Sequence, residues 1–427
     1  MKFVLASWGS RGDVEPYVTV GRELDRRGHN VRMAVAPEMV DFVESAGLAV
    51  VAYGPSMQTS FDVHRSWARV FRNFWRIQDL RRLSRELSDL VTQGWGDGTT
   101  TLLSLADGAD LVLTSCVGFE HLAANIAEYY DIPLATLFTF PWRANGQLLS
   151  FLPAPLGRSA MTVYEWLSRG GAAKKIEQAQ RRELGLPKAT GPWPWRIAKR
   201  GSLEIQAYDE VCYPGLADEW AKWNGQRPPK RPFVGALTME LPTDTDEEIA
   251  SWIAAGPPPS CFGFGSIPVE SAADTLAMIS SACAQLGRRA LICAAGTDFS
   301  GVSHFDHVKV VSVMNYAAAL PACRAFVHHG GSGTTNAGLR AGVPALVLWT
   351  MPDQGAWGER VRRLKVGARR RFSTTTQESL VTDLRTILDP QYLTRARQLA
   401  ARMTKPAESV AVAADLVENF ARLKRVG

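Results

Sequence analysis

The stretch AFVHHGGSGTTNAGLRAGVPALVLW, residues 325–349, decides the fold of this chain. Its two apolar ends, 325–328 and 345–348, have the length and composition of buried β-strands. Between them stand a glycine-rich turn and a segment, 336–341, that is predicted as a helix. A strand, a turn, a helix and a second strand in this order are typical of a parallel sheet, because parallel neighbours need a crossover connection.

The same alternation extends through most of the chain. Further strands are predicted at 3–6, 31–36, 111–114, 134–138, 260–264, 290–293 and 308–311. Residues 132–141 and 343–352 also share a pattern, in which a proline, an apolar strand and a second proline follow at the same spacing. Two similar doubly wound domains would produce this repeat, although any two α/β units resemble each other to some degree.

The composition indicates an ordinary globular protein. A chain of 427 residues is long for one core, and 46% hydrophobic with 21% charged residues argues against disorder. No apolar run reaches the ~18 residues of a membrane-spanning helix, and the opening apolar run is too short for a secretory signal, so we expect a cytoplasmic protein.

The six cysteines form no CxxC pair, which predicts free thiols. The net charge of +6 suits phosphate-bearing ligands or an anionic membrane surface, and no partner nucleic acid is expected.

Proline and glycine cluster at 213–235 and mark a domain boundary. We expect an N-terminal domain at 1–215, a linker at 216–240, a C-terminal domain at 241–405, and a terminal helix at 406–427 that packs back on the N-terminal domain. Asp244 and Asp246 form a DxD pair, which holds a metal ion in some sugar-transferring folds. Because no strand leads into this pair, we interpret it as the cap of an exposed helix and expect no metal site.

The glycine-rich turn after the strand 325–328 has the residues of a phosphate site. Glycines let the backbone approach a ligand closely, and the free N–H groups at a helix start attract a diphosphate. The turn also carries hydroxyl and imidazole donors at Ser332, Thr334 and His329. No GxxxxGK[ST] motif occurs, and the sequence GFGSIP at 263–268 is a poor match to a nicotinamide-binding fingerprint, which is the competing interpretation. Asp353 and Gln354, past the next strand, could bind sugar hydroxyls at the same edge of the sheet.

Residues 61–90 combine aromatic residues at helical spacing with seven arginines. The aromatic candidates for acceptor binding are Trp67, Phe71, Phe74 and Trp75. A basic amphipathic helix of this kind could bind an amphiphilic ligand or lie on an anionic membrane. The alternative is a surface helix that buries its aromatic stripe and solvates its arginines.

Together these motifs resemble those of a known enzyme family. The run 329–335, the sequence RAGVP at 340–344 and the pair Asp353–Gln354 resemble the donor-binding signature of the family-one glycosyltransferases of the GT-B fold. The sequence SRGDVEP at 10–16 is similar to the first-strand loop of one branch, which includes sterol, glycopeptide-antibiotic and bacterial glycopeptidolipid glycosyltransferases. The resemblance spans essentially the whole chain and is weakest at 55–110 and 142–210, where the acceptor-binding segments of the family vary.

The resemblance implies an α/β protein with the GT-B fold, in which two Rossmann-like doubly wound domains face each other across a cleft. The first domain would bind the acceptor and the second a nucleotide sugar. Residues implied in donor binding are Ser10, Arg11, Ser266, the backbone near Val313, His329, Gly330, Gly331, Ser332, Gly333, Thr334, Asp353 and Gln354. Many plant relatives have a ribose-binding glutamate where this chain has Ala337, so both dTDP and UDP donors stay open.

Asp13 stands where many relatives have a catalytic histidine. A carboxylate there could remove the proton from the acceptor hydroxyl while that hydroxyl attacks the anomeric carbon. The alternative is that Asp13 caps the following helix, and the two roles are compatible. Arg11 could help to neutralise the leaving diphosphate.

The sequence therefore predicts an inverting, metal-independent hexosyltransferase without a cofactor. It would move a hexose or deoxyhexose from a dTDP- or UDP-sugar to a hydroxyl of an amphiphilic acceptor such as a lipopeptide or glycolipid. Alternatives are a sterol or polyketide glucosyltransferase and, in another class, a non-catalytic nucleotide-sugar-binding protein. Peripheral contact with the inner face of the membrane is a further expectation.

Overall fold

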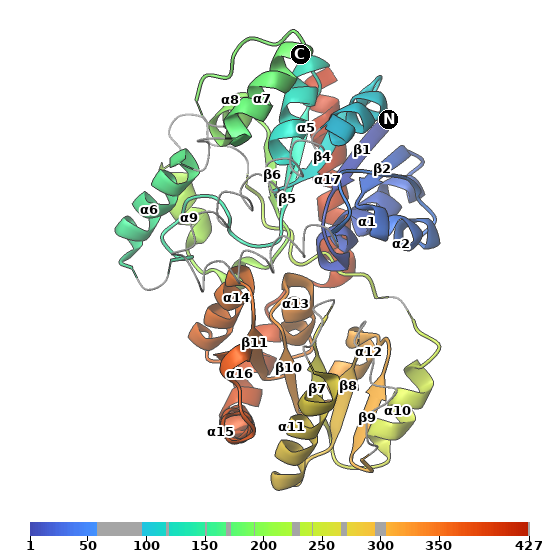
Figure 1. Ribbon diagram of the computed structural model, residues 1–427, viewed down its shortest axis with the longest axis vertical. Helices are drawn as coiled ribbons and strands as arrows, with labels where there is room; N and C mark the ends of the chain where they lie inside the picture. The colour runs from blue at the N-terminus through green and yellow to red at the C-terminus, as the bar shows by residue number, and fades with distance from the viewer. Residues whose placement is uncertain are drawn as a thin grey trace, which may run out of the picture. The chain divides into compact units, whose positions relative to one another are not determined.

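The computed structural model describes residues 1–57, 96–116, 119–149, 152–167, 172–191, 193–223, 231–240, 242–265, 271–294 and 305–425. The chain forms two compact units. Unit 1 consists of Met1–Tyr208, Gly215–Leu237 and Pro406–Gly427, and unit 2 of Asp209–Pro214 and Thr238–Lys405. Figure 1 shows both units with their element labels.

The division differs from the expected linker at 216–240. Most of that range belongs to unit 1, where α9 (Leu216–Trp223) packs through the buried Trp220, whose ring stacks on Phe233 at 6.0 Å between centroids. The short segment Asp209–Pro214, by contrast, belongs to unit 2.

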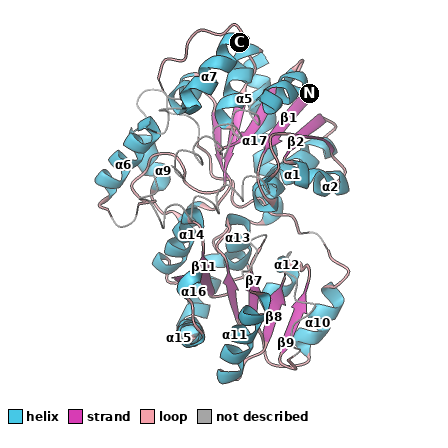
Figure 2. Ribbon diagram, in the orientation of Figure 1, coloured by secondary structure: helices cyan, strands magenta, loops and turns pink. Residues whose placement is uncertain are grey.

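The sheet of unit 1 has six parallel strands in the order β3-β2-β1-β4-β5-β6. The strands are β1 (Lys2–Ser7), β2 (Asn30–Val35), β3 (Ala49–Ala52), β4 (Leu111–Ser115), β5 (Leu134–Phe138) and β6 (Leu203–Gln206). Helices cover it on both faces (Figure 2), so β4 and β5 are buried along their whole length. The helices are α1 (Arg11–Arg26), α2 (Val40–Ser45), α5 (Glu120–Tyr129), α6 (Ala154–Leu167), α7 (Ala172–Glu183), α8 (Trp193–Lys199), α9 and α17 (Pro406–Arg425), with a 3-10 turn at Pro37–Met39.

The sheet of unit 2 repeats this topology. Its six parallel strands follow the order β12-β11-β10-β7-β8-β9, which is the same arrangement written from the other edge. The strands are β7 (Ser260–Gly263), β8 (Ala290–Cys293), β9 (Val308–Val311), β10 (Ala325–His328), β11 (Ala345–Trp349) and β12 (Gly367–Arg371). The helices are α10 (Asp246–Ala254), α11 (Ala272–Gln285), α12 (Tyr316–Ala319), α13 (Ser332–Arg340), α14 (Pro352–Arg363), α15 (Gln377–Ile387) and α16 (Pro390–Ala400), with 3-10 turns at Glu210–Cys212, Leu320–Ala322 and Phe372–Thr374.

Both sheets therefore have the strand order of a Rossmann fold. The predicted class, two doubly wound α/β domains, is confirmed. The repeated pattern at 132–141 and 343–352 also has a structural basis, because β5 and β11 are the fifth strands of the two sheets.

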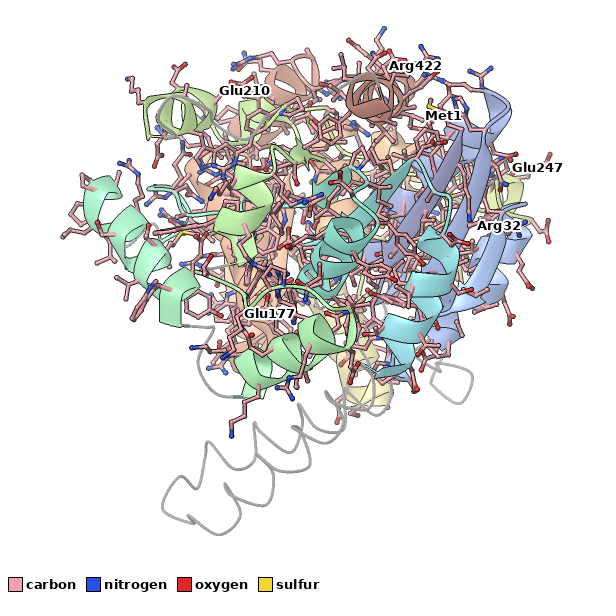
Figure 3. The ribbon with its side chains drawn as sticks, turned by 90° about the horizontal axis from the view of Figure 1, so that it is seen from above. Met1, Arg32, Glu177, Glu210, Glu247 and Arg422 are labelled. Atoms are coloured by element: carbon pink, nitrogen blue, oxygen red, sulfur yellow. The ribbon has the colours of Figure 1, made fainter. Side chains whose placement is uncertain are left out.

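The last helix, α17, is part of unit 1 and packs on α1. Its side chains Ala413, Ala414 and Val417 are buried, and Arg27 at the end of α1 forms ion pairs with Asp415 at 2.6 Å and with Glu418 at 3.0 Å. Arg422, labelled in Figure 3, lies on the exposed side of α17. The chain thus returns to its first unit for its final twenty-odd residues.

Two smaller expectations are also met, the second only in part. All six cysteines are free. Asp246 is the first residue of α10, after the N-cap Thr245, and it accepts hydrogen bonds from the Thr243 amide at 2.9 Å and the Thr243 hydroxyl at 2.5 Å, so it lies at the helix start as expected but is not itself the cap. No helix in the described ranges is both long and apolar enough to cross a membrane.

Candidate active site

In unit 2, the loops after β7 and β10 meet where the strand order reverses. These two strands are neighbours, and open α/β sheets bind ligands beyond the carboxyl ends of strands at this switch point. His329 follows β10, and its backbone amide donates to Gly263 O at 3.3 Å. A Cβ on Gly265 would lie 2.5 Å from His329 Cε1, and one on Gly331 would lie 2.5 Å from His329 Nε2. The imidazole therefore lies between two backbone segments that leave room for it only because they are glycine.

The helix α13 starts directly after this imidazole. Its N-cap is Gly331, and no side chain of the described residues caps it through a hydrogen bond. The positive end of the helix dipole at this N-terminus attracts an anion. His329 Nδ1 is buried and has no hydrogen-bond partner among the described residues. Burial lowers the pKa of His329, so the ring is neutral near pH 7 and offers one N–H donor.

His328 fixes the shape of the turn. It is fully buried, its ring stacks on Phe326 at 4.7 Å between centroids, and its Nδ1 accepts a hydrogen bond from the Gly330 amide at 3.1 Å. Burial lowers the pKa of His328 to about 3. Because Nδ1 accepts, the proton of the neutral ring is on Nε2. Gly330 itself has a φ of +96°, a conformation that glycine adopts without strain.

The start of α14 lies against the same turn. A Cβ on Gly330 would lie 2.9 Å from Gln354 O, so the two loops are in van der Waals contact. Gln354 is buried, and its Oε1 accepts from Thr350 N at 2.9 Å, Thr350 Oγ1 at 2.9 Å and Met351 N at 3.0 Å. Asp353 is exposed in the first turn of α14 and acts electrostatically on His329. The structure thus brings together the predicted phosphate residues and the predicted sugar residues of unit 2.

The remaining candidates of unit 2 have different settings. Val313 follows β9, its side chain is exposed, and its carbonyl accepts a hydrogen bond from Thr245 Oγ1 at 3.2 Å. Ser266 lies outside the described residues, as do the aromatic candidates Trp67, Phe71, Phe74 and Trp75.

In unit 1, Asp13 occupies the third position of α1, next to the carboxyl end of β1. The helix begins at Arg11 with Ser10 as N-cap, three residues earlier than the sequence suggested. Asp13 Oδ2 accepts from the Ser10 amide at 2.8 Å and from Ser10 Oγ at 2.9 Å, which is the reach-back contact of a capping box. A Cβ on Gly9 would lie 2.5 Å from Asp13 Oδ2, so this glycine makes room for the carboxylate. Capping is therefore one role of Asp13.

The neighbouring Arg11 is half exposed and already has a partner. Its Nε donates to Glu15 Oε2 at 3.1 Å, and its guanidinium lies 4.9 Å from the centre of the Phe42 ring. Ser10 is engaged with Asp13.

A buried ionic cluster in the same unit escaped the sequence analysis. Arg143 is 4% exposed and donates to Glu120 Oε1 at 2.6 Å and to Glu204 Oε1 at 2.7 Å. Trp193 Nε1 donates to Glu120 Oε2 at 3.0 Å, and Arg231 pairs with Glu204 at 2.5 Å. Burial opposes the charge of Arg143, yet the two carboxylates raise its pKa above the usual value.

This cluster lies near Asp13, because Glu120, Arg143 and Asp13 all act electrostatically on the partly buried Cys116, which follows β4. The ion pairs of this cluster connect the segments after β4 and β5 with β6 at that edge of the sheet. No sequence signal marks it, since its members are separated by up to 111 residues (from Glu120 to Arg231).

Two Rossmann-type units, the second with an imidazole between two glycines at a helix start, define a doubly wound α/β protein. Comparison with known proteins narrows the class. Residues 3–98 match the model of the glycosyltransferase family 28 N-terminal domain, and residues 265–419 match the erythromycin biosynthesis protein CIII-like C-terminal domain. The chain is 55% identical over 428 residues to a glycosyltransferase, Rv1524, of Mycobacterium tuberculosis, with 100% of both chains covered. It is 25% identical to a sterol 3-beta-glucosyltransferase of Arabidopsis thaliana, over 97% of this chain and 67% of the plant protein.

Solved structures agree on the fold. The calicheamicin glycosyltransferase CalG4 superposes with a TM-score of 0.70 at 18% identity, covering 98% of each chain. The glycosyltransferase VinC in complex with dTDP superposes with a TM-score of 0.63 at 19% identity, covering 100% of each chain. The chain belongs to the glycosyltransferases of the GT-B fold, and it is a glycosyltransferase.

Proposed function

We propose that this enzyme transfers a hexose or deoxyhexose from a dTDP- or UDP-sugar to a hydroxyl of an amphiphilic acceptor, with inversion and without a metal ion. The observation that carries the donor half of this proposal is the His329 imidazole between Gly265 and Gly331 at the uncapped start of α13. That arrangement supplies an imidazole donor and backbone N–H groups to one anion. A dTDP donor is favoured because solved structures of the same fold, VinC among them, hold that nucleotide.

In this proposal the diphosphate binds at the N-terminus of α13. His329, Ser332 and Thr334 and the backbone of Gly330, Gly331 and Gly333 contact it. These donors stabilise the negative charge that develops on the leaving diphosphate. In other sugar-transferring folds a metal ion stabilises this charge. Asp353 and the amide of Gln354 bind the sugar hydroxyls, while Ser266 and the backbone at Val313 contact the nucleotide.

Asp13 acts as the general base. It takes the proton of the acceptor hydroxyl as the oxygen attacks the anomeric carbon from the face opposite the diphosphate, so the configuration inverts. The hydrogen bonds from Ser10 to Oδ2 hold the carboxylate in one orientation. Arg11 lies two residues before Asp13 on α1, where it forms an ion pair with Glu15.

An amphiphilic acceptor suits the outward face of α6. The side chains Leu156, Val163, Tyr164 and Trp166 are between 54% and 63% exposed, whereas the two charged side chains of the same helix, Arg158 and Glu165, are only partly exposed. Arg158 pairs with Glu219 at 2.7 Å, and Glu165 accepts from the Ala144 amide at 2.8 Å. An apolar outward face of this kind also supports peripheral contact with a membrane surface. The sterol alternative is favoured by the plant relative, which is a sterol 3-beta-glucosyltransferase.

The test is a thermal-shift titration with dTDP, UDP and GDP. A ligand at about 100 times its Kd adds roughly 2.7 kcal/mol to the stability of the folded state, which is a readily measured shift. We expect dTDP or UDP to raise the Tm and GDP to leave it unchanged. Absence of a shift with all three nucleotides would contradict the donor site, and binding without turnover of any dTDP- or UDP-sugar would favour a binding protein over an enzyme.

A further inference from the structure

The chain passes between its two units at four points, after Tyr208, Pro214, Leu237 and Lys405. Residues next to three of these points are joined inside unit 2. Asp209 is 2% exposed, and its Oδ1 accepts a hydrogen bond from the Thr404 amide at 2.6 Å. Its Oδ2 lies 3.9 Å from Arg340 Nη2, and Arg340 Nη1 donates to Thr238 Oγ1 at 3.2 Å. Arg340 and the buried carboxylate of Asp209 therefore connect the chain segments at residues 209, 238 and 404.

The fourth point lies at the end of the same short segment, Asp209–Pro214. The ring of Tyr213 is 2% exposed and lies 5.7 Å from the Trp357 ring, nearly perpendicular to it. The guanidinium of Arg360, a residue of α14, lies 4.2 Å from the centre of the Tyr213 ring. A cation over a desolvated aromatic ring is a favourable contact. The segment is thus bound to α13 through Asp209 and to α14 through Tyr213.

These two helices are the ones that begin at the proposed donor site. Arg340 is the last residue of α13, about 12 Å along the axis from Ser332 at 1.5 Å per residue. Trp357 and Arg360 lie in the second half of α14, whose first turn holds Asp353 and Gln354. The segment Asp209–Pro214 therefore contacts the far ends of both helices, although it precedes them by more than a hundred residues of sequence.

We propose that Arg340 and Asp209 are positioning residues of the donor site. They hold α13 in the position in which its N-terminus binds the nucleoside diphosphate. They also couple donor binding to the segments that connect the two units. The inference rests on the proposed donor function. It also explains the RAGVP motif at 340–344, where Arg340 forms the anchor and Gly342, with a φ of +68°, ends the helix behind it.

The coupling has a physical basis in burial. Arg340 and Asp209 have side chains that are 11% and 3% exposed, and Asp209 is the first of the carboxylates, ahead of Glu240, that favour the charge of Arg340. A short helix moves as a rigid body, and a displacement at Arg340 therefore appears at Ser332.

The first test uses the wild-type enzyme and hydrogen–deuterium exchange with and without saturating dTDP. We expect protection at 329–336 together with protection at 209–214 and 403–405. Protection at 329–336 without any change at 209–214 would overturn the coupling and leave the donor site intact. No protection at 329–336 would overturn the donor site and the inference with it.

The second test compares Arg340→Met with Arg370→Met as the matched control. Arg370 pairs with Asp383 at 2.5 Å in the same unit, and among the described residues its side-chain hydrogen bonds go to Asp383. We expect a five- to tenfold higher Kd for dTDP in Arg340→Met, within the usual range of coupling between sites, and partial recovery in Arg340→Lys, which keeps the charge. An unchanged Kd in Arg340→Met, or an equal change in the Arg370 control, would refute the positioning role.

A milder variant covers the case in which Arg340→Met does not fold. Thr238→Val removes only the hydroxyl that accepts from Arg340 and leaves the ion pair with Asp209 in place. We expect it to reduce the dTDP-dependent protection at 209–214 while the Tm stays close to wild type. Full protection in Thr238→Val would contradict a coupling that runs through Arg340 to the connection at 237–238.

Discussion

Replacing Gly331 with alanine tests whether the His329 ring contacts the donor. The backbone at Gly331 has φ −58° and ψ 146°, a conformation that alanine adopts without strain. The added methyl would nevertheless lie 2.5 Å from His329 Nε2, and an ordinary contact begins at 3.4 Å. The ring must therefore withdraw by about 0.9 Å, the difference between these two distances.

Such a shift is enough to break one hydrogen bond. A bond of about 2.9 Å between the imidazole and a phosphate oxygen would lengthen to about 3.8 Å, which is beyond hydrogen-bond range. Hydrogen bonds to charged groups contribute about 1.5–3 kcal/mol, so we expect the Kd for dTDP to rise roughly 10- to 150-fold. Isothermal titration calorimetry measures this change directly, and the Tm without ligand serves as the control for folding.

A double-mutant cycle shows whether the effect runs through the ring. In a His329→Ala background the space next to Gly331 is vacant, and Gly331→Ala should then change the Kd by less than about twofold. If Gly331→Ala weakens dTDP equally in both backgrounds, the methyl acts on the ligand or the backbone, and the role of His329 as a donor is refuted. If it weakens dTDP in neither, the imidazole makes no contact with the diphosphate.

Four other predictions concern the base, the sugar, the metal and pH. Asp13→Asn should lower kcat by at least ~100-fold with dTDP affinity unchanged, and wild-type turnover in this variant would leave Asp13 as a helix cap only. Gln354→Ala should weaken the nucleotide sugar but not free dTDP, whereas His329→Ala should weaken both in the same titrations. Excess EDTA should leave the initial rate within about twofold, and loss of activity restored by magnesium or manganese would show a metal requirement. Because burial holds the pKa of His328 at about 3, below the value near 6.5 of an unfolded chain, protonation favours unfolding and stability is lost as the pH falls below about 6.5. This group alone should cost about 2 kcal/mol at pH 5, and His328→Asn, which keeps an acceptor for the Gly330 amide, should show a smaller difference between urea denaturation at pH 7 and pH 5.

The strands that the sequence predicted best are short apolar runs, and apart from the edge strand β9 they lie inside the sheets. The bounds of β5, β8, β9 and β10 agree with prediction to the residue. Strands of a parallel sheet covered on both faces form short continuous apolar runs, and such runs are visible without any knowledge of their neighbours. The helix start at Asp246 is visible for a similar reason, since the acidic first turn of a helix depends on a few adjacent residues.

Three strands were missed, and each depends on its surroundings. β3 and β12 are edge strands, and β12 has the sequence GARRR, in which arginines pair with Glu359 and Asp383. β6 contains Glu204, whose burial is tolerated because Arg143 and Arg231 neutralise it. A polar strand of this kind cannot be recognised until its partners are known.

The sequence by itself determined the chemistry of the candidate site. The glycines, hydroxyls and histidine of 329–334 and the capped turn at Ser10 and Asp13 are local, because each feature needs only the few residues around one turn. The tertiary structure alone decided which distant groups support that chemistry. Gly265 next to His329, Arg143 between two carboxylates, and Asp209 beneath α13 are contacts between residues 23 to 131 positions apart, and they form because packing two layers of helices on a twisted sheet brings those positions together.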